Sequence, residues 1–325
     1  MNKTASLINK IAEYFEVRSY LQLGLPNINT FKDIAVQFKV GVDEKYTAKN
    51  TEEIAGAHIL TLAADSFLLT WESSEMAHQH EKFDLIYLHD CHCFAGTLDA
   101  FVQSLSVAHP DSIWLLDNTV PQDPYAAYPD KHRCIEWKKF ACFGSKAWQG
   151  DVFKCVIAIH DKYPEISYCT ITEPPNSLTV FWKAPPLPER RPAFDSIQAI
   201  AGLDYFAMLA RAKLLMPIPG EALLPVIGMS LAPDLNPDPT LWKKLVFAPR
   251  WKKLIFRPNS SFPNKPQRII LAGYQPVLKL FSRPDAYKMY VKEPSAFFAR
   301  TRHPVNKVVC SLLGCLGPNP RKNTG

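Results

Sequence analysis

The sequence predicts an α/β fold with a doubly wound, mostly parallel sheet. Short apolar runs bounded by turns and polar stretches recur along the first half of the chain, at 18–24, 38–42, 66–71, 83–88 and 112–116. Helical patterns fill most of the gaps, and at 94–107 the apolar residues share one face of a helix. The last three runs are too continuously apolar for a half-exposed hairpin, so we expect them to be buried strands. Strands alternating with helices in this way are typical of a doubly wound sheet.

The sequence also predicts how this domain begins and ends. An opening helix is expected at 4–16, before the first strand. A helix at 151–162 precedes two further strands, at 166–172 and 178–182, and the Glu-Pro-Pro-Asn between them is a turn of the hairpin kind. We therefore expect a seven-stranded sheet that closes with an antiparallel hairpin.

Prolines mark the end of the predicted domain. The run Ala-Pro-Pro-Leu-Pro-Glu-Arg-Arg-Pro at 184–192 breaks regular structure, and 194–216 has the pattern of one more helix. We expect a Rossmann-like domain at 1–183, a Pro-rich linker with one helix at 184–240, and a basic C-terminal tail at 241–325.

The tail and the rest of the chain carry opposite charge. The net charge is +6, but residues 241–325 hold 17 Lys and Arg against two acidic residues, so residues 1–240 are acidic. The tail contains one nine-residue unit twice, at Trp242–Arg250 and Trp251–Asn259. It could pack on the domain through its tryptophans, contact an anionic membrane surface, or bind nucleic acid or an acidic partner. No nucleic-acid recognition module accompanies the charge, which disfavours nucleic acid.

Cysteine usage and hydropathy indicate the compartment. The eight cysteines show neither a CxxC motif nor the spacing of a disulfide framework, so we expect reduced thiols. The N-terminal segment lacks the apolar core of a secretory signal, and no run of 18 or more apolar residues predicts a membrane span. The expected compartment is the cytoplasm, with peripheral membrane contact through the tail as the alternative.

Glycine or polar residues end the predicted strands, where the ligands of open α/β sheets bind. Gly24 ends the first strand, and a side chain there would block the approach of a nucleotide to the backbone. Asp43 ends the second strand about 20 residues on, the spacing of carboxylates that bind ribose hydroxyls. Glu72 ends the third predicted strand and is expected on the adenine side. The fourth and fifth strands end in His89-Asp90-Cys91-His92 and Asp117-Asn118.

Five segments then occur in a recognisable order and spacing. They are Tyr20-Leu-Gln-Leu-Gly-Leu25, Val40-Gly-Val-Asp43, Phe83–His92, Leu115-Leu-Asp117 and Trp148-Gln-Gly-Asp-Val-Phe-Lys154. Together they resemble a family of bacterial class I S-adenosylmethionine-dependent methyltransferases, and the match extends over residues 18–183. The resemblance implies S-adenosyl-L-methionine as cofactor, with Trp148 and Asp151 near the methyl acceptor. The cofactor-binding residues that it implies are Gln22, Gly24, Asp43, Glu72 and His89.

The sequence departs from the family pattern at three places. Gln22 stands where the family has an acidic residue, and Pro26-Asn27-Ile28-Asn29 replaces the glycine-rich loop. His89 replaces an aspartate, although Asp90 follows it. Because the sulfonium of the cofactor is cationic, losing carboxylates weakens its attraction to the site. Two hypotheses follow: an enzyme with a divergent cofactor pose, and a non-catalytic scaffold whose basic tail binds a membrane surface or an acidic partner.

The enzyme hypothesis implies methyl transfer from sulfur to an oxygen or nitrogen of a small molecule or glycan. A general base with a pKa near neutrality serves this reaction best, which favours His92, with Asp117 or Asp90 as the orienting carboxylate. The loop 119–147 is expected to cover the acceptor. It offers aromatic contacts from Tyr125, Tyr128 and Trp137. A nucleic-acid methyltransferase is a third hypothesis.

The same residues have other interpretations. Gly24 could be a simple turn glycine, Asp43 a solvated strand-end residue, and His92 a capping or packing residue. Asp117-Asn118 also resembles the magnesium-binding pair of catechol-type O-methyltransferases, with Asp90 as the third ligand but one place out of register. A zinc site would draw on His89, Cys91, His92 and Cys93, but alternate residues of a strand point apart. We expect no metal.

Overall fold

The structure is a computed structural model that describes residues 3–47, 56–78, 80, 82–89, 92–141, 145–172, 177–184 and 190–231. The whole predicted tail, including both copies of its repeat, lies outside the described residues. Asp90 and Cys91 lie outside them as well.

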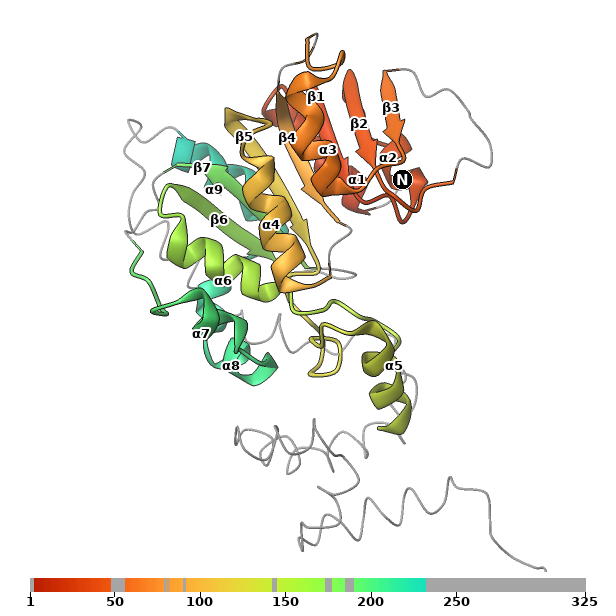
Figure 1. Cartoon of the computed structure of the whole chain (residues 1–325). Helices are drawn as coiled ribbons and strands as arrows, with labels where there is room; N and C mark the ends of the chain where they lie inside the picture. Colours follow the sequence, from red (N-terminus) through yellow and green to blue (C-terminus); the bar gives the residue numbers. More distant parts are fainter. Residues whose placement is uncertain are drawn as a thin grey trace, which may run out of the picture. The chain divides into compact units, whose positions relative to one another are not determined.

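An eight-stranded sheet forms the centre of the described part of the chain, in the order β3-β2-β1-β4-β5-β7-β6-β8 (Figure 1). The strands are β1 (Ser19–Leu23), β2 (Phe38–Val42), β3 (Ala57–Leu60), β4 (Phe83–Leu88), β5 (Ala108–Asp117), β6 (Ile166–Ile171), β7 (Leu178–Lys183) and β8 (Pro217–Ile218). All described pairings are parallel except those of β7, which runs antiparallel to both β5 and β6. The predicted fold class, a mostly parallel sheet that closes with an antiparallel hairpin, is therefore confirmed, and β8 adds a short eighth strand.

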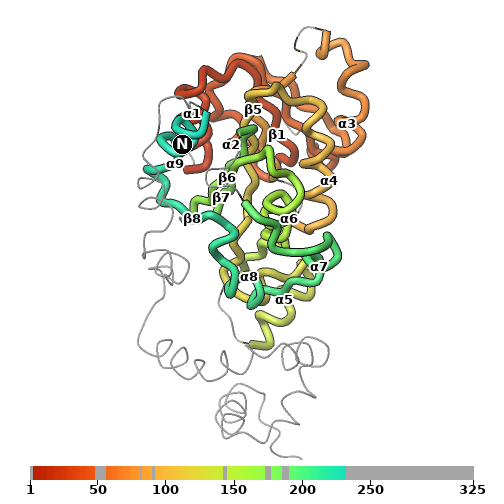
Figure 2. Tube along the Cα trace, turned by 90° about the vertical axis from the view of Figure 1, so that its left-hand side faces the viewer, coloured from red at the N-terminus to blue at the C-terminus, as the bar shows by residue number. Residues whose placement is uncertain are grey.

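Helices cover both faces of the sheet (Figure 2). One face packs against α3 (Ala64–Thr70), α4 (Phe94–Ser104) and α6 (Phe153–Lys162), and the other against α1 (Lys3–Tyr14), α2 (Ile28–Lys32) and α9 (Leu223–Leu231). Because both faces are covered, β1 and β2 are buried along their whole length and β4 is buried except at Asp84. The opening helix and the helix before the hairpin form where the sequence predicts them.

The third strand was predicted in the wrong place. The run 66–71 lies in α3 and in the 3₁₀ turn η1 (Trp71–Ser73), while the third strand is β3. Phe67, Leu68 and Trp71 are buried but Leu69 is 77% exposed, which is the pattern of a helix rather than of a strand. Over six residues an apolar run does not distinguish the two structures. The spacing of apolar residues was therefore insufficient to assign residues 66–71 to a strand or a helix.

The segment 190–231 packs on the domain. Where one helix was expected at 194–216, the chain forms α7 (Ile197–Ala201), α8 (Tyr205–Ala210) and the 3₁₀ turn η2 (Ala212–Leu215). β8, the 3₁₀ turn η3 (Gly220–Ala222) and α9 follow. Side chains from this segment belong to the cores on both faces of the sheet. None of the helices in the described part of the chain is long and apolar enough to cross a membrane.

Candidate active site at the carboxyl edge of the sheet

Four of the predicted site residues lie in one row across neighbouring strands. Leu23 at the end of β1 pairs with Val42 of β2 and Leu88 of β4, and Leu88 pairs with Leu116 of β5. The next residue of each strand continues these pairings. This row, which we call the edge row, consists of Asp43, Gly24, His89 and Asp117. It lies at the carboxyl edge of the sheet, where doubly wound folds bind their ligands.

Gly24 turns the chain at the tip of β1. Its φ angle is +91°, a conformation that side-chain-bearing residues rarely adopt. The next residue, Leu25, folds back over Gly41 of β2, where an added Cβ would lie 2.9 Å from a Leu25 methyl carbon. Two glycines therefore shape this tip: one permits the turn, and the other leaves room for the side chain that follows it.

Gln22 is buried beneath this turn. Its amide nitrogen donates to the carbonyl oxygen of Gly24 at 2.8 Å, and its amide oxygen accepts from the Tyr20 hydroxyl at 2.9 Å. A carboxylate could not make the first of these hydrogen bonds, so the departure from the family's acidic residue fits this turn. Because both ends of the amide are engaged within the protein, Gln22 supports the backbone beneath the edge row.

Asp43 joins the tips of β1 and β2. Its carboxylate accepts from the backbone N–H of Leu25 at 2.9 Å through Oδ2 and from that of Lys45 at 2.8 Å through Oδ1. An ionised carboxylate offers about four acceptor positions. The two hydrogen bonds in the described part of the chain thus use about half of these positions.

His89 and Asp117 form a close pair at the tips of β4 and β5. The His89 Nδ1 atom lies 2.8 Å from Asp117 Oδ2, and the Tyr87 hydroxyl lies 3.0 Å from the same nitrogen and 3.2 Å from the same oxygen. Burial and the Asp117 carboxylate both hold the pKa of Tyr87 well above its usual value, so Tyr87 remains a hydrogen-bond donor. The pair is thus fixed by a neutral phenol beneath it.

This arrangement determines which nitrogen of His89 can act as a base. Since an ionised carboxylate only accepts hydrogen bonds, the neutral imidazole carries its proton on Nδ1. No residue in the described ranges hydrogen-bonds to Nε2, and the side chain of His89 is 19% exposed against 4% for Asp117. In the neutral form of the imidazole, Nε2 is therefore the nitrogen without a proton.

Two other members of the predicted site do not join the edge row. Glu72 lies in η1, and the neighbouring Trp71 packs on Phe83 at the amino end of β4, with ring centroids 4.8 Å apart. The predicted place of Glu72 at the end of the third strand is therefore wrong. The residue that follows β3 beside Asp43 is Thr61. The predicted orienting role of Asp90 falls outside the described residues.

His92 packs against the segment between β5 and α6. Its ring stacks on Trp148 with centroids 4.4 Å apart. Gly150 has a φ angle of +72°, and a Cβ there would overlap the carbonyl oxygen of His92. The Trp148 indole N–H donates to the Tyr128 carbonyl at 2.7 Å. His92 and Trp148 thus attach this segment to the start of α4.

Asp151 also has contacts within the protein. It accepts from the backbone N–H of Phe94 at the start of α4 at 2.7 Å, and it pairs with Lys154 at 2.8 Å. Lys154 in turn donates to the Ala201 carbonyl at 2.8 Å. Asp151 therefore caps α4 from a distant part of the chain, while its predicted contact with an acceptor stays a prediction.

The donor set does not suit a magnesium ion. The β4 residue in register with Asp117 is His89, whose nitrogen engages the carboxylate oxygen that a metal would need, and magnesium prefers oxygen ligands. Among the described residues, no group of three His, Cys, Asp or Glu side chains could hold a metal ion. Asp90 and Cys91, which the magnesium and zinc alternatives require, lie outside those residues.

Sequence reasoning missed Tyr87 and the role of Gly150. Tyr87 precedes His89 by two residues in a strand, so both side chains point to the same face. A tyrosine at this spacing was a signal that could have been found. Gly150 lies in one of the segments that resemble the family, but its close approach to His92 needed the structure.

No family model matches the chain, and no curated protein matches it. Solved structures do. The O-methyltransferase from Bacillus cereus in complex with S-adenosylhomocysteine (SAH) is 14% identical, over 56% of this chain and 82% of that one, with a TM-score of 0.39. TomG from Streptomyces achromogenes, an O-methyltransferase of tomaymycin synthesis solved with S-adenosylmethionine, is 14% identical over 55% and 79%, with a TM-score of 0.37. The plantazolicin methyltransferase BpumL with SAH is 14% identical over 56% and 84%, with a TM-score of 0.38. All three are methyltransferases.

Proposed function

We propose that the protein is an S-adenosylmethionine-dependent methyltransferase whose site is the carboxyl edge of the sheet. The observation that carries the proposal is the edge row itself. On four adjacent strands it brings together the glycine turn at Gly24, the carboxylate of Asp43, and His89 paired with the buried Asp117.

These residues fit an adenosyl group at the tips of β1 and β2. Gly24 presents backbone without a side chain, and Asp43 keeps acceptor positions for the ribose hydroxyls. The bound cofactor supplies an electrophilic methyl group. Because Gln22 carries no charge, the carboxylates of Asp43 and Asp117 are the anionic groups of the edge row that favour a cationic cofactor.

His89 is the general base of the proposed reaction, in place of His92. Its Nε2 would accept the proton of the acceptor oxygen or nitrogen, the atom to which the bound cofactor would give up the methyl group of its sulfonium. Asp117 keeps the imidazole in the required tautomer and stabilises the imidazolium that forms. Tyr87 holds the Asp117 oxygen in place. The acceptor is a small molecule or glycan.

Calorimetric titration with SAH tests the proposal. We expect the full chain to bind SAH at sub-millimolar concentration, and Gly24→Ala to weaken binding at least about tenfold, because the new side chain strains the turn and blocks the cofactor. His89→Gln is the matched control, since it changes the proposed base but not the nucleotide end of the site. It should bind SAH within about threefold of the unchanged protein. No heat with the unchanged protein would instead favour the non-catalytic scaffold.

A further inference from the structure

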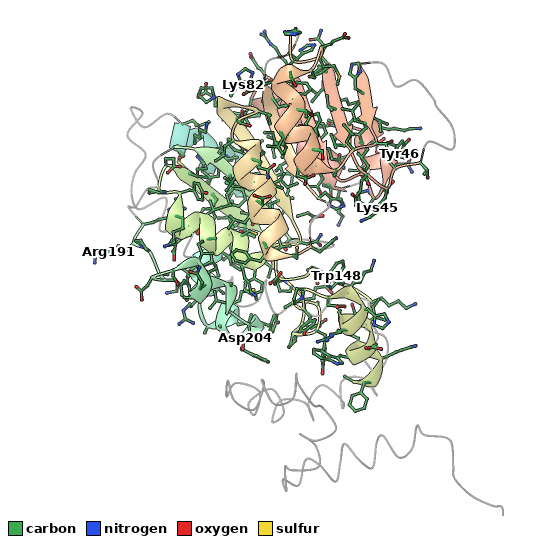
Figure 3. All side chains as sticks on the ribbon, viewed as in Figure 1. Lys45, Tyr46, Lys82, Trp148, Arg191 and Asp204 are labelled. Atoms are coloured by element: carbon green, nitrogen blue, oxygen red, sulfur yellow. The ribbon has the colours of Figure 1, made fainter. Side chains whose placement is uncertain are left out.

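The helix α5 (Lys131–Phe140) carries a group of cations next to the candidate active site. It lies in the segment 118–152, between β5 and α6, beyond the carboxyl edge of the sheet (Figure 1). Figure 3 shows Trp148 between that edge and α5. Lys131 in the first turn of α5 contacts Trp148, and Trp148 stacks on His92, three residues beyond His89, so this turn is connected to the segment that follows β4.

Two cations in this first turn rest on aromatic side chains. The ammonium of Lys131 lies 5.5 Å from the ring centroid of Trp148, and the guanidinium of Arg133 donates to the Tyr128 hydroxyl at 3.3 Å. Both cationic side chains are exposed. An aromatic ring or a phenol holds a cation in position but does not neutralise it. The carboxylates of Asp130 and Glu136 compensate part of the charge of Arg133, but the exposed side chains of Lys131 and Arg133 still offer N–H donors to a ligand.

The anchoring of α5 fixes where these cations lie. Lys138, on the buried side of the helix, pairs with Asp123 at 2.9 Å and donates to the Ala147 carbonyl at 2.5 Å. Asp123 also accepts from the backbone N–H of Ala126 at 2.7 Å. Lys138 thus joins α5 both to the part of the segment before the helix and to the part after it. The two cations are therefore preorganised for binding.

Two further observations bear on the ligand, the first on its charge and the second on its hydrogen-bond donors. Residues 1–240 are acidic as a whole, so exposed cations beside the proposed site contrast with their surroundings. Gln149, next to Trp148, is buried, and its side-chain oxygen has no hydrogen-bond partner in the described part of the chain. A buried acceptor of this kind costs free energy until a donor, such as a ligand hydroxyl, reaches it.

We propose that the methyl acceptor carries an oxyanion, a carboxylate or a phosphate, which Lys131 and Arg133 bind at the entrance to the site. The assignment of the bound anion to a methyl acceptor rests on the proposed function, whereas the binding of an anion by Lys131 and Arg133 does not. Arg133 can contact either group through two N–H donors, and Lys131 acts as a point charge. The acceptor is thus an anionic small molecule or an anionic sugar rather than a neutral one.

Anion titrations followed by NMR test the proposal on the full chain. The indole N–H signal of Trp148, assigned by its loss in Trp148→Phe, reports directly on the ring beneath Lys131. We expect inorganic phosphate or acetate, added at constant ionic strength, to shift this signal saturably. The double variant Lys131→Gln/Arg133→Gln should weaken that binding at least about tenfold. Tighter binding of phosphate indicates a phosphorylated acceptor, and tighter binding of acetate indicates a carboxylic acid.

A matched control uses another exposed lysine of the same helix. Lys139→Gln removes the same charge near the other end of α5 and should leave the titration unchanged. Linear shifts, or equal weakening in Lys139→Gln and the double variant, would mean non-specific screening and would overturn the proposal. SAH titration of the same samples separates the two claims: unchanged SAH affinity shows that the double variant is folded. Saturable anion binding without any SAH binding would support the anion site and overturn the proposed function.

Discussion

At the scale of single residues, two histidines only three positions apart have different described contacts. His89 continues β4 by one residue and therefore lies in register with Asp117, which contacts its Nδ1 atom. His92 lies beyond the strand, at the start of α4, and stacks on Trp148. The choice between them as a base thus depends on strand register, which residue type alone does not reveal.

The tautomer of His89 provides a test at this scale. In Asp117→Asn an amide NH₂ can replace the carboxylate, so Nδ1 becomes the acceptor and the proton moves to Nε2. We expect the dominant tautomer to switch, as measured from the ring nitrogen shifts in long-range ¹H–¹⁵N spectra. Tyr87→Phe keeps the carboxylate and should keep the Nδ1–H tautomer. If Asp117→Asn leaves the nitrogen shifts of His89 unchanged, Asp117 does not fix the tautomer.

At the scale of elements, a buried ion pair attaches α5 to its segment. Lys138 and Asp123 have side chains that are only 3% and 9% exposed, and each also hydrogen-bonds to backbone within the segment. The exposed face of α5 is mostly charged and adds little apolar burial. This ion pair therefore helps to position the helix, together with the buried Cys134 and the contact between Trp137 and Tyr128.

Breaking that contact should loosen α5 without unfolding the sheet. Lys138→Met leaves Asp123 buried without its cation, and removing one partner of such a pair costs on the order of 3 kcal/mol. We expect hydrogen exchange to show the opening free energy of the α5 amides lowered by about that amount. Lys139→Met is the control on the exposed side, with an expected effect under about 0.5 kcal/mol. Equal protection in the two variants would refute the anchoring role of Lys138.

At the scale of the whole molecule, the sequence predicted the central strands of the sheet better than its edge strands. Short apolar runs bounded by turns marked the central strands β1, β2, β4 and β5, most of whose residues are buried. The edge strand β3 is only partly buried, and its apolar signal was weaker than that of the helix α3. β8 has two residues and is held by tertiary pairing with β6, which no local pattern encodes.

The same distinction applies to the candidate site. Strand ends placed Gly24, Asp43 and Asp117 at the carboxyl edge, because parallel strands end together. The pairing of Asp117 with His89 needed the register, and the mislocated third strand misplaced Glu72. Lys131 and Arg133 lie in the long connection between β5 and α6, where the buried Lys138–Asp123 pair joins residues 15 positions apart, which no local pattern encodes.

A buried histidine connects several parts of the molecule. His160 of α6 lies 2.8 Å from the Tyr168 hydroxyl of β6 through Nδ1, and 3.3 Å from the Arg191 carbonyl through Nε2. Tyr168 in turn donates to the Leu214 carbonyl in η2. Burial, reinforced by the neighbouring Arg190, lowers the pKa of His160 below its usual value. The folded protein therefore keeps this histidine neutral at pH values where the unfolded chain protonates it.

This difference predicts how stability depends on pH. Between the usual histidine pKa of about 6.5 and the lower folded value, the unfolded chain binds one more proton at this site, so acidification favours unfolding. From pH 7.5 to 5.5 we expect His160 to contribute a loss in the free energy of unfolding of at most about 1.4 kcal/mol per pH unit. Denaturant titrations of His160→Gln should show a shallower pH dependence than the unchanged protein, whatever its absolute stability. His132→Gln, on the exposed face of α5, should retain the full dependence, since that histidine lies largely in solvent in both states. Identical slopes for His160→Gln and the unchanged protein would assign the acid sensitivity to other groups.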